Sequence, residues 1–475
     1  MPVSAPTPTL PALTLPSLAR KGVTVDFEGG DLSSDAGFLP LKLADEQLGL
    51  TAAIAAAIED LRDPAKVQHE ALSLLCERIY LIAAGYEDAI DAQTLRHDPL
   101  LKATVGRTPA DPALAGQSTL SRFENSITRA DLQRLGPVFL EVFLARCGPN
   151  PREIVLDFDP FVDPAHGAQQ GVLFNGHYDT YCYLPLYLCG RVDGGREYVV
   201  GALLRGGTAP ATKGARFLLK YIVRALRVRF PDVQIIVRGD SAFGVAKMLR
   251  TCNHLQVKYC FGLARNAALG RHSADIQARA AAATALRQKH CPRRAPARRA
   301  FGEFQYAAGT WRETERVIAK GEVTQGDRNT RYVVTNLAAA DGWTPRRVYL
   351  FYCGRGNPEN RLKEFKVDLR ADRLSCEFRL ANQFRLLLHV AAYHLYQQVQ
   401  DALAAVTESN SEWRGAQVAT IREKLCKVAA RVRTRCRTVR VSLPSSYPWA
   451  GVWRALVLHL SQAPAGSGQK FALNT

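Results

Sequence analysis

The pattern that most constrains the fold lies between residues 154 and 264, where short apolar segments alternate with segments of helical period. The strands expected there are 154–159, 180–189, 197–204, 233–239 and 257–264. Helices are expected at 213–229 and 243–254, and the pair Gly194 and Gly195 marks a hairpin between the second and third strands. The element order β-β-β-α-β-α-β predicts an α/β fold with a mixed five-stranded sheet flanked by helices.

Acidic residues occupy two places in this pattern that a sheet would bring together. Asp157 and Asp159 share one face of the first strand, and the fourth strand ends at Asp240. The order of elements is that of a ribonuclease-H-like fold, in which the first and fourth strands lie side by side. Asp159 and Asp240 are then expected to meet. Taken singly, each has a plainer explanation as an acid at a strand end or turn.

A third acid, Glu359, lies in the segment 349–369. This segment is expected to open as a short apolar strand and then to begin a helix, with Asn357 as the N-cap and Pro358 at the first helical position. Its polar residues are spaced Tyr352-x2-Arg355-x3-Glu359-x6-Lys366. A plainer interpretation is an acid that complements the helix dipole, with solvated basic residues around it.

Charge and cysteine usage narrow the class of protein. The 475 residues include 62 Lys and Arg against 44 Asp and Glu, a net charge of +18 that suggests a polyanionic partner, nucleic acid first. None of the 11 cysteines forms a Cys-x2-Cys pair, which argues against a zinc ribbon and a secreted disulfide framework. No apolar run is long enough to span a membrane, and the Pro-rich start does not resemble a signal peptide.

Six regions are expected along the chain. They are a flexible Pro-rich arm (1–25), a helical N-terminal DNA-binding domain (26–150), the first part of the ribonuclease-H-like core (151–265), an insertion with a basic helix and β-strands (266–345), the second part of the core with the third acid (346–405), and a basic C-terminal region (406–475). Within the second region, a short helix from Gln117 either enters a DNA groove or braces a helical bundle.

Several stretches together resemble the DDE transposases of bacterial insertion sequences, in the Y-R-E-K signature group of the 1380-type family. The stretches are 60–98, 117–125, Leu156 to Gly167, Val237 to Phe243 and the Tyr352 segment. The resemblance extends from residue 26 to about residue 443. One departure is Phe161, which stands where this family usually has threonine. It leaves open whether Asp157 or Asp159 is the first metal ligand.

The resemblance implies a DNA transposase that cleaves the ends of its own insertion sequence and transfers the 3′-hydroxyl strands into target DNA. Two divalent ions can stabilise both the attacking and the leaving oxygens of such a reaction, and Mg²⁺ prefers carboxylate oxygens. Asp159, Asp240 and Glu359 would therefore hold two Mg²⁺ ions, with Mn²⁺ able to substitute. The DNA phosphates beside the scissile bond would be held by Tyr352, Arg355 and Lys366.

Trp311 lies in the expected β-rich insertion, where it either packs on its own sheet or stacks on a base extruded from the DNA. The expected partners are double-stranded DNA, as terminal inverted repeats and target, and a second copy or more of this chain, with no membrane. The expected location is the cytoplasm, on the nucleoid. Two alternatives stay open: a ribonuclease-H-like nuclease without strand transfer, and a non-catalytic DNA-binding regulator.

Overall fold

The computed structural model describes residues 11–18, 21–290, 298–324, 327–355 and 363–462, and they divide between two compact units. One unit combines residues 1–49, 61–122 and 398–468, and the other combines 50–60, 123–397 and 469–475. The first is called the terminal unit below, because it joins segments from both ends of the chain. The second, which holds the large sheet, is called the sheet unit.

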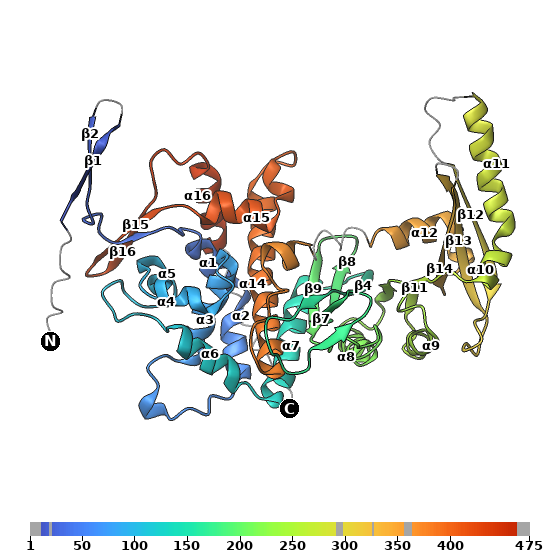
Figure 1. Ribbon diagram of the computed structural model, residues 1–475, viewed down its shortest axis with the longest axis horizontal. Coiled ribbons are helices and arrows are strands. Elements are labelled where there is room, and N and C mark those ends of the chain that lie inside the picture. Colours follow the sequence, from blue (N-terminus) through green and yellow to red (C-terminus); the bar gives the residue numbers. More distant parts are fainter. Residues whose placement is uncertain (1–10, 19–20, 291–297, 325–326, 356–362, 463–475) are drawn as a thin grey trace. The chain divides into compact units, whose positions relative to one another are not determined.

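The sheet unit is built on an eight-stranded sheet with the order β12-β13-β14-β11-β10-β4-β8-β9. All of these strands except β10 are labelled in Figure 1. Its strands are β4 (Glu153–Pro160), β8 (Leu186–Val192), β9 (Glu197–Leu203), β10 (Gln234–Gly239), β11 (Lys258–Leu263), β12 (Arg299–Tyr306), β13 (Glu315–Thr324) and β14 (Asp327–Thr335). The small strands β5 (Asp163–Pro164), β6 (Leu173–Asn175) and β7 (Thr180–Tyr183) form a separate sheet. The single strand expected at 180–189 is thus divided between β7 and β8.

The five strands predicted as the core are neighbours in this sheet, in the order β11-β10-β4-β8-β9. β4 and β10 pair in parallel, ending with Phe158 opposite Gly239, which confirms that the first and fourth strands lie side by side. β8 pairs with β4 in the antiparallel direction, so the sheet is mixed. This arrangement is compatible with the predicted ribonuclease-H-like fold.

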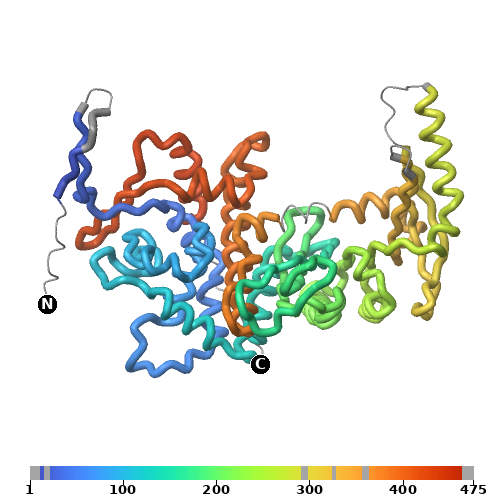
Figure 2. The backbone as a smooth tube through the Cα atoms, in the orientation of Figure 1, coloured from blue at the N-terminus to red at the C-terminus, as the bar shows by residue number. Residues whose placement is uncertain are grey.

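The insertion continues this sheet. β14 pairs antiparallel with β11, and β13 and β12 follow as a meander. Helix α11 (Ala274–His290) contacts β12 and β13, and α10 (Ala267–His272) leads into it. The yellow and light-orange part of the trace in Figure 2 therefore includes the outer strands β12, β13 and β14 of the same sheet that carries the predicted acids.

Each face of the sheet has its own buried cluster, because side chains alternate along the strands. Ile154, Leu156 and Phe158 of β4 belong to the larger cluster, together with helices α7 (Arg129–Arg146), α8 (Ala215–Arg229) and α9 (Ala246–His254). Val155 belongs to the smaller cluster on the opposite face. Asp157 and Asp159 follow Val155 at steps of two, so they share its face, as the alternation predicted.

Helix α12 (Pro345–Cys353) covers the smaller cluster, and here the prediction of an apolar strand at Tyr349 was wrong. Thr344 accepts a hydrogen bond from the Arg347 backbone N–H as N-cap, and Pro345 stands in the first turn, both favourable at a helix start. Val348 and Tyr349 are buried against the sheet. The run of β-branched and aromatic residues resembles a strand locally, but packing on the sheet outweighs that preference.

The remaining helices of the sheet unit are α2 (Leu50–Ala57), the end of α6 (Gln117–Ser126) and most of α14 (Arg379–Val406). Both α6 and α14 pass from one unit to the other. A π-helical turn spans Glu364–Asp368. Phe365 and Leu369 are buried, as predicted from their helical spacing. The expected helix start at Asn357 and Pro358 lies outside the described residues.

The terminal unit contains α1 (Phe38–Leu48), α3 (Ala71–Ala84), α4 (Ala92–Leu95), α5 (Pro99–Thr104), α15 (Val418–Ile421) and α16 (Ala450–Gln462). Its strands are β1 (Leu13–Leu18), β2 (Lys21–Val25), β3 (Leu32–Ser33), β15 (Ala430–Arg435) and β16 (Thr438–Ser442). β15 and β16 form a hairpin whose base pairs with β3. Among the described residues, no helix combines the length and the apolar character that crossing a membrane requires.

Candidate active site

Asp159 and Asp240 stand at the same edge of the sheet. β4 and β10 are parallel, and Phe158 and Gly239 form their last Cα pair, so Asp159 and Asp240 are the next residues along the two neighbouring strands. The Asp159 side chain keeps 21% of its surface exposed. One Asp240 oxygen, Oδ1, accepts a hydrogen bond of 2.8 Å from the Ala242 backbone N–H. Two carboxylates that are far apart in the sequence are thereby brought together.

Asp157, on the same face of β4, is engaged differently. Arg238 of β10 donates to both of its carboxylate oxygens, at 2.7 Å from Nε and 2.6 Å from the second nitrogen. Both side chains are buried, and Asp157 raises the pKa of Arg238 although burial alone would lower it. A carboxylate held on both oxygens by a buried guanidinium has little capacity left to bind a metal ion.

Arg238 also connects this pair to helix α12. Its guanidinium donates a 2.7 Å hydrogen bond to the Phe351 carbonyl and lies 4.8 Å from the centroid of the Phe351 ring. One buried side chain therefore joins both acid-bearing strands to the helix that carries Tyr352. Sequence reasoning did not single out Arg238. The available signal was a charged residue inside the otherwise apolar strand 235–239.

Tyr352 and Arg355 lie beside the two strand-end aspartates. A methyl group added to Gly262 of β11 would lie 2.6 Å from the Tyr352 hydroxyl oxygen and 3.3 Å from the Asp240 carbonyl carbon. The Tyr352 hydroxyl and the Asp240 backbone are therefore both close to Gly262. One Arg355 guanidinium nitrogen lies 3.8 Å from Asp159 Oδ1, and the guanidinium carbon is 5.8 Å from the Tyr352 ring centroid. Burial raises the pKa of Tyr352, while Arg355 opposes that rise.

Lys366 lies near the end of β4. Its ammonium nitrogen is 5.8 Å from the centroid of the Phe161 ring and 3.7 Å from Asp372. Phe161 in turn stacks on Tyr187 of β8, with ring centroids 4.8 Å apart. Phe161 thus packs on the sheet through Tyr187 and offers its ring to Lys366.

Two further residues, Glu359 and Trp311, were predicted for the site. Glu359 lies outside the described residues, and among the described ones no group of three or more His, Cys, Asp or Glu side chains could hold a metal ion. Trp311 is half-buried in the connection between β12 and β13. It packs with Tyr306, at 5.6 Å between ring centroids, on the larger cluster of the opposite sheet face. Its role in binding DNA stays a prediction.

Comparison with known families places the chain in a transposase family. Residues 15–465, nearly the whole chain, match the family described as transposase DDE domain group 1. The chain belongs to this family of transposases. No curated protein matches it.

A second buried arginine lies near the transposase's Asp240. Arg205 donates to two backbone carbonyls, at 2.8 Å to Leu184 before β8 and at 2.6 Å to Ala211 after β9. Burial lowers the pKa of Arg205 to about 10, and the negative charge of Asp240 opposes this fall. Because Arg205 binds carbonyls before β8 and after β9, it fixes the loops close to Asp240. Its sequence context, between apolar residues and two glycines, gave no sign of this.

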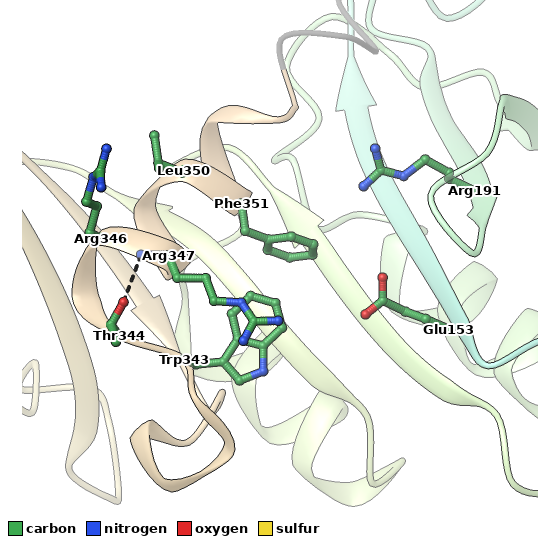
Figure 3. Close-up of a pocket in the computed structure, with 8 residues that line it drawn as sticks. All are labelled: Glu153, Arg191, Trp343, Thr344, Arg346, Arg347, Leu350 and Phe351. Atoms are coloured by element: carbon green, nitrogen blue, oxygen red, sulfur yellow. Dashed lines mark hydrogen bonds between the residues drawn. The ribbon is translucent and has the colours of Figure 1, made fainter.

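The transposase also has a cationic pocket at the other end of β4, with a volume of about 510 Å³ (Figure 3). Its lining residues are Glu153, Arg191, Trp343, Thr344, Arg346, Arg347, Leu350 and Phe351. The Arg347 guanidinium carbon lies 4.4 Å from the centroid of the Trp343 ring. Three arginines against one glutamate make the pocket attractive to anions, although the two arginines on α12 are exposed and strongly screened.

Proposed function

We propose that this transposase cleaves the ends of its own insertion sequence and transfers the resulting 3′-hydroxyl strands into target DNA. The proposal also assigns the chain to the Y-R-E-K group, of the 1380 type. The observation that supports it best is the placement of Asp159 and Asp240 at the ends of two neighbouring parallel strands, with Tyr352 and Arg355 beside them. A nuclease without strand transfer would use the same acids, so the transfer step needs its own assay.

In this proposal Asp159, Asp240 and Glu359 hold two Mg²⁺ ions. The two described carboxylates offer the hard oxygen ligands that Mg²⁺ prefers, while Asp157 is already neutralised by Arg238. When bound, the ions would activate the attacking oxygen and stabilise the leaving one. Asp159 is therefore proposed as the first ligand. Arg355 would neutralise excess acid charge before metal binds and turn to a DNA phosphate afterwards.

The basic residues around the acids have separate proposed roles. Tyr352 would hydrogen-bond a phosphate beside the scissile bond, because its pKa is raised and it keeps its proton as a donor. Lys366, which is 32% exposed, would contact a phosphate as a point charge. The transposase would act as a dimer or larger assembly on duplex DNA, with the terminal inverted repeats as its specific substrate, and its place would be the cytoplasmic nucleoid.

The test is cleavage and strand transfer, with Mg²⁺ or Mn²⁺, on duplexes made from the DNA that flanks the gene, where the proposal expects a terminal inverted repeat. Asp159→Ala, Asp240→Ala and Glu359→Ala should each abolish both reactions while DNA binding stays within a few-fold, because the phosphate contacts remain. Robust cleavage by any of the three would refute the assigned triad. Cleavage by the parent protein without joined products would favour the nuclease instead.

Asp157→Asn is the matched control for the choice between the two aspartates of β4. Removing one partner of a buried ion pair typically costs about 3–5 kcal/mol. This variant should therefore lose stability in urea unfolding, whereas Asp159→Asn should unfold like the parent and still be inactive. If Asp157→Asn were stable but inactive, and Asp159→Asn active, the first ligand would be Asp157.

A further inference from the structure

Strands β15 and β16 of the terminal unit, labelled in Figure 1, form a hairpin. The sequence of this hairpin is rich in arginine. Because side chains alternate along each strand, one face of the hairpin holds every second residue of β15 and the residues opposite them. The arginines on this face are Arg431, Arg433, Arg435 and Arg440. We call this face the arginine ribbon. Arg437 lies in the turn that joins the two strands.

The opposite face of the hairpin explains how it is held in place. Val432 is 1% exposed and its backbone N–H donates a 2.8 Å hydrogen bond to the Asp31 carbonyl. β15 pairs with β3 only at its base, where Ala430 and Arg431 meet Ser33 and Leu32. From Arg433 onward β15 pairs with β16, and all the arginines of the ribbon are exposed.

The ribbon contains a repulsive contact that folding alone does not require. Arg433 and Arg440 are direct cross-strand partners, and like charges in that position destabilise a hairpin. Within the described part of the chain, no ion pair joins any arginine of the ribbon to a carboxylate. A threonine or an opposite charge at either position would stabilise the strands better. The positive charge therefore indicates an external anion.

We infer that the arginine ribbon binds the phosphates of duplex DNA, an inference that rests on the proposed function. A two-stranded ribbon fits the major groove of B-DNA, and arginine suits phosphate because its planar guanidinium presents several donors. Arginines at every second position of β15 recur about every 7 Å. The ribbon thus supplies a row of contacts along a DNA strand. It belongs to the terminal unit, separate from the acids of the sheet unit.

The inference predicts an unusual combination of effects for the double variant Arg433→Gln with Arg440→Gln. Binding to a fluorescent duplex of about 30 base pairs and arbitrary sequence should weaken by roughly tenfold at 0.1 M salt. The slope of log K against log salt should become less steep by about 1.8, since each phosphate contact contributes about 0.9. The thermal unfolding midpoint should equal or exceed that of the parent, because the cross-strand repulsion is gone. A purely structural role would lower the midpoint.

The matched control is Arg224→Gln with Arg229→Gln, which removes two exposed arginines from α8. It should leave the salt slope unchanged. If the salt slope fell equally in both double variants, the cause would be the general loss of positive charge, and the assignment to the ribbon would be overturned. So would an unchanged slope in the ribbon variant, or binding to phosphatidylserine vesicles that depends on Arg433 and Arg440 while duplex binding does not. A parent protein that binds no duplex at all would refute the proposed function as well.

Cys436 offers a direct probe of position. It is exposed in the turn of the hairpin, next to Arg437. A duplex with an activated disulfide tether should exchange with the Cys436 thiolate, forming a protein–DNA disulfide and releasing the leaving thiol. The experiment is done in a Cys353→Ser background, because Cys353 is also exposed and lies between Tyr352 and Arg355, the proposed phosphate contacts. In that background Cys436→Ser should remove the product. A cross-link that survives Cys436→Ser at full yield would place the DNA elsewhere and overturn the inference.

Discussion

Three aspartates near the end of β4 differ in ionisation and in their availability as ligands because their neighbours differ. Asp157 is neutralised by the buried Arg238, and Asp159 stays partly exposed beside Arg355. Asp163 is fully buried in β5, and its burial raises its pKa to about 9. Asp372 adds to that rise, while the Leu374 backbone N–H and Lys366 oppose it only in part. The surroundings, more than the residue type, decide which acid is available as a ligand.

The raised pKa of Asp163 predicts a dependence of stability on pH. An unfolded aspartate has a pKa near 3.9, so between about pH 4 and about pH 9 the unfolded chain releases a proton that the native protein retains. The free energy of unfolding should therefore fall as pH rises through this window, by at most about 1.4 kcal/mol per pH unit. Asp163→Asn, which cannot ionise, should be more stable than the parent at pH 8 and should lose that advantage near pH 4.

Urea unfolding at several pH values measures this difference. A difference in the free energy of unfolding between Asp163→Asn and the parent that stayed constant from pH 4 to pH 8 would contradict the prediction, because it would reflect packing and not ionisation. Asp372→Asn is a useful companion, since it removes the second cause of the raised pKa. In the Asp372→Asn variant the pKa of Asp163 should be lower than in the parent, so the pH range over which stability falls should end at a lower pH.

At the scale of elements, the close packing of α12 on β11 sets the position of Tyr352. Gly262 is required there because an added Cβ would meet the Tyr352 hydroxyl oxygen at 2.6 Å, the Ser241 nitrogen at 3.0 Å and the Asp240 carbonyl carbon at 3.3 Å. Two of these atoms belong to the backbone after β10, so they cannot rotate away. The added carbon must therefore move Tyr352, the Asp240 turn, or both.

Gly262→Ala should reduce DNA cleavage by roughly 100-fold, since displacements near 1 Å at a reacting centre have effects of that size. Duplex binding should stay close to that of the parent. Gly270→Ala, where nothing lies within 4 Å, is the matched control and should cleave normally. In the background of Tyr352→Phe, which lacks the hydroxyl, Gly262→Ala should have a smaller additional effect. Equal effects in both backgrounds would contradict the role assigned to this contact.

Local patterns made part of the fold predictable. The segments from β4 to β11 were recognisable because alternation and glycine-marked turns are local properties of the sequence. Helix α12 was missed because Val348, Tyr349 and Phe351 have strand-like propensity, and their burial on the sheet is not visible locally. The partner of Asp157 was also missed, because Arg238 lies on another strand and only the parallel register of β4 and β10 brings them together.

At the scale of the whole molecule, the insertion is a structural part of the sheet that carries Asp159 and Asp240. The sequence placed its strands between the second and third acids but did not show that β14 would pair with β11. Val334 belongs to the larger cluster and Val333 to the smaller one, so the insertion contributes to both faces. The sidechain hydroxyl of Thr335 also donates a 2.6 Å hydrogen bond to the Tyr259 carbonyl.

Residues 267–335 can be replaced by a Gly-Ser linker of about ten residues, which is long enough to connect the chain after β11 to residue 336. This replacement should prevent folding of the sheet unit. The deletion would expose the edge of β11, whose sequence 258–263 is mostly apolar, and exposed apolar edges promote aggregation. Solubility and the cooperativity of thermal unfolding are the measurements. Deleting residues 1–25 is the control, because β1 and β2 form a sheet of their own, and the unfolding midpoint should barely change. A soluble, cooperatively unfolding protein without residues 267–335 would instead identify the insertion as an independent module.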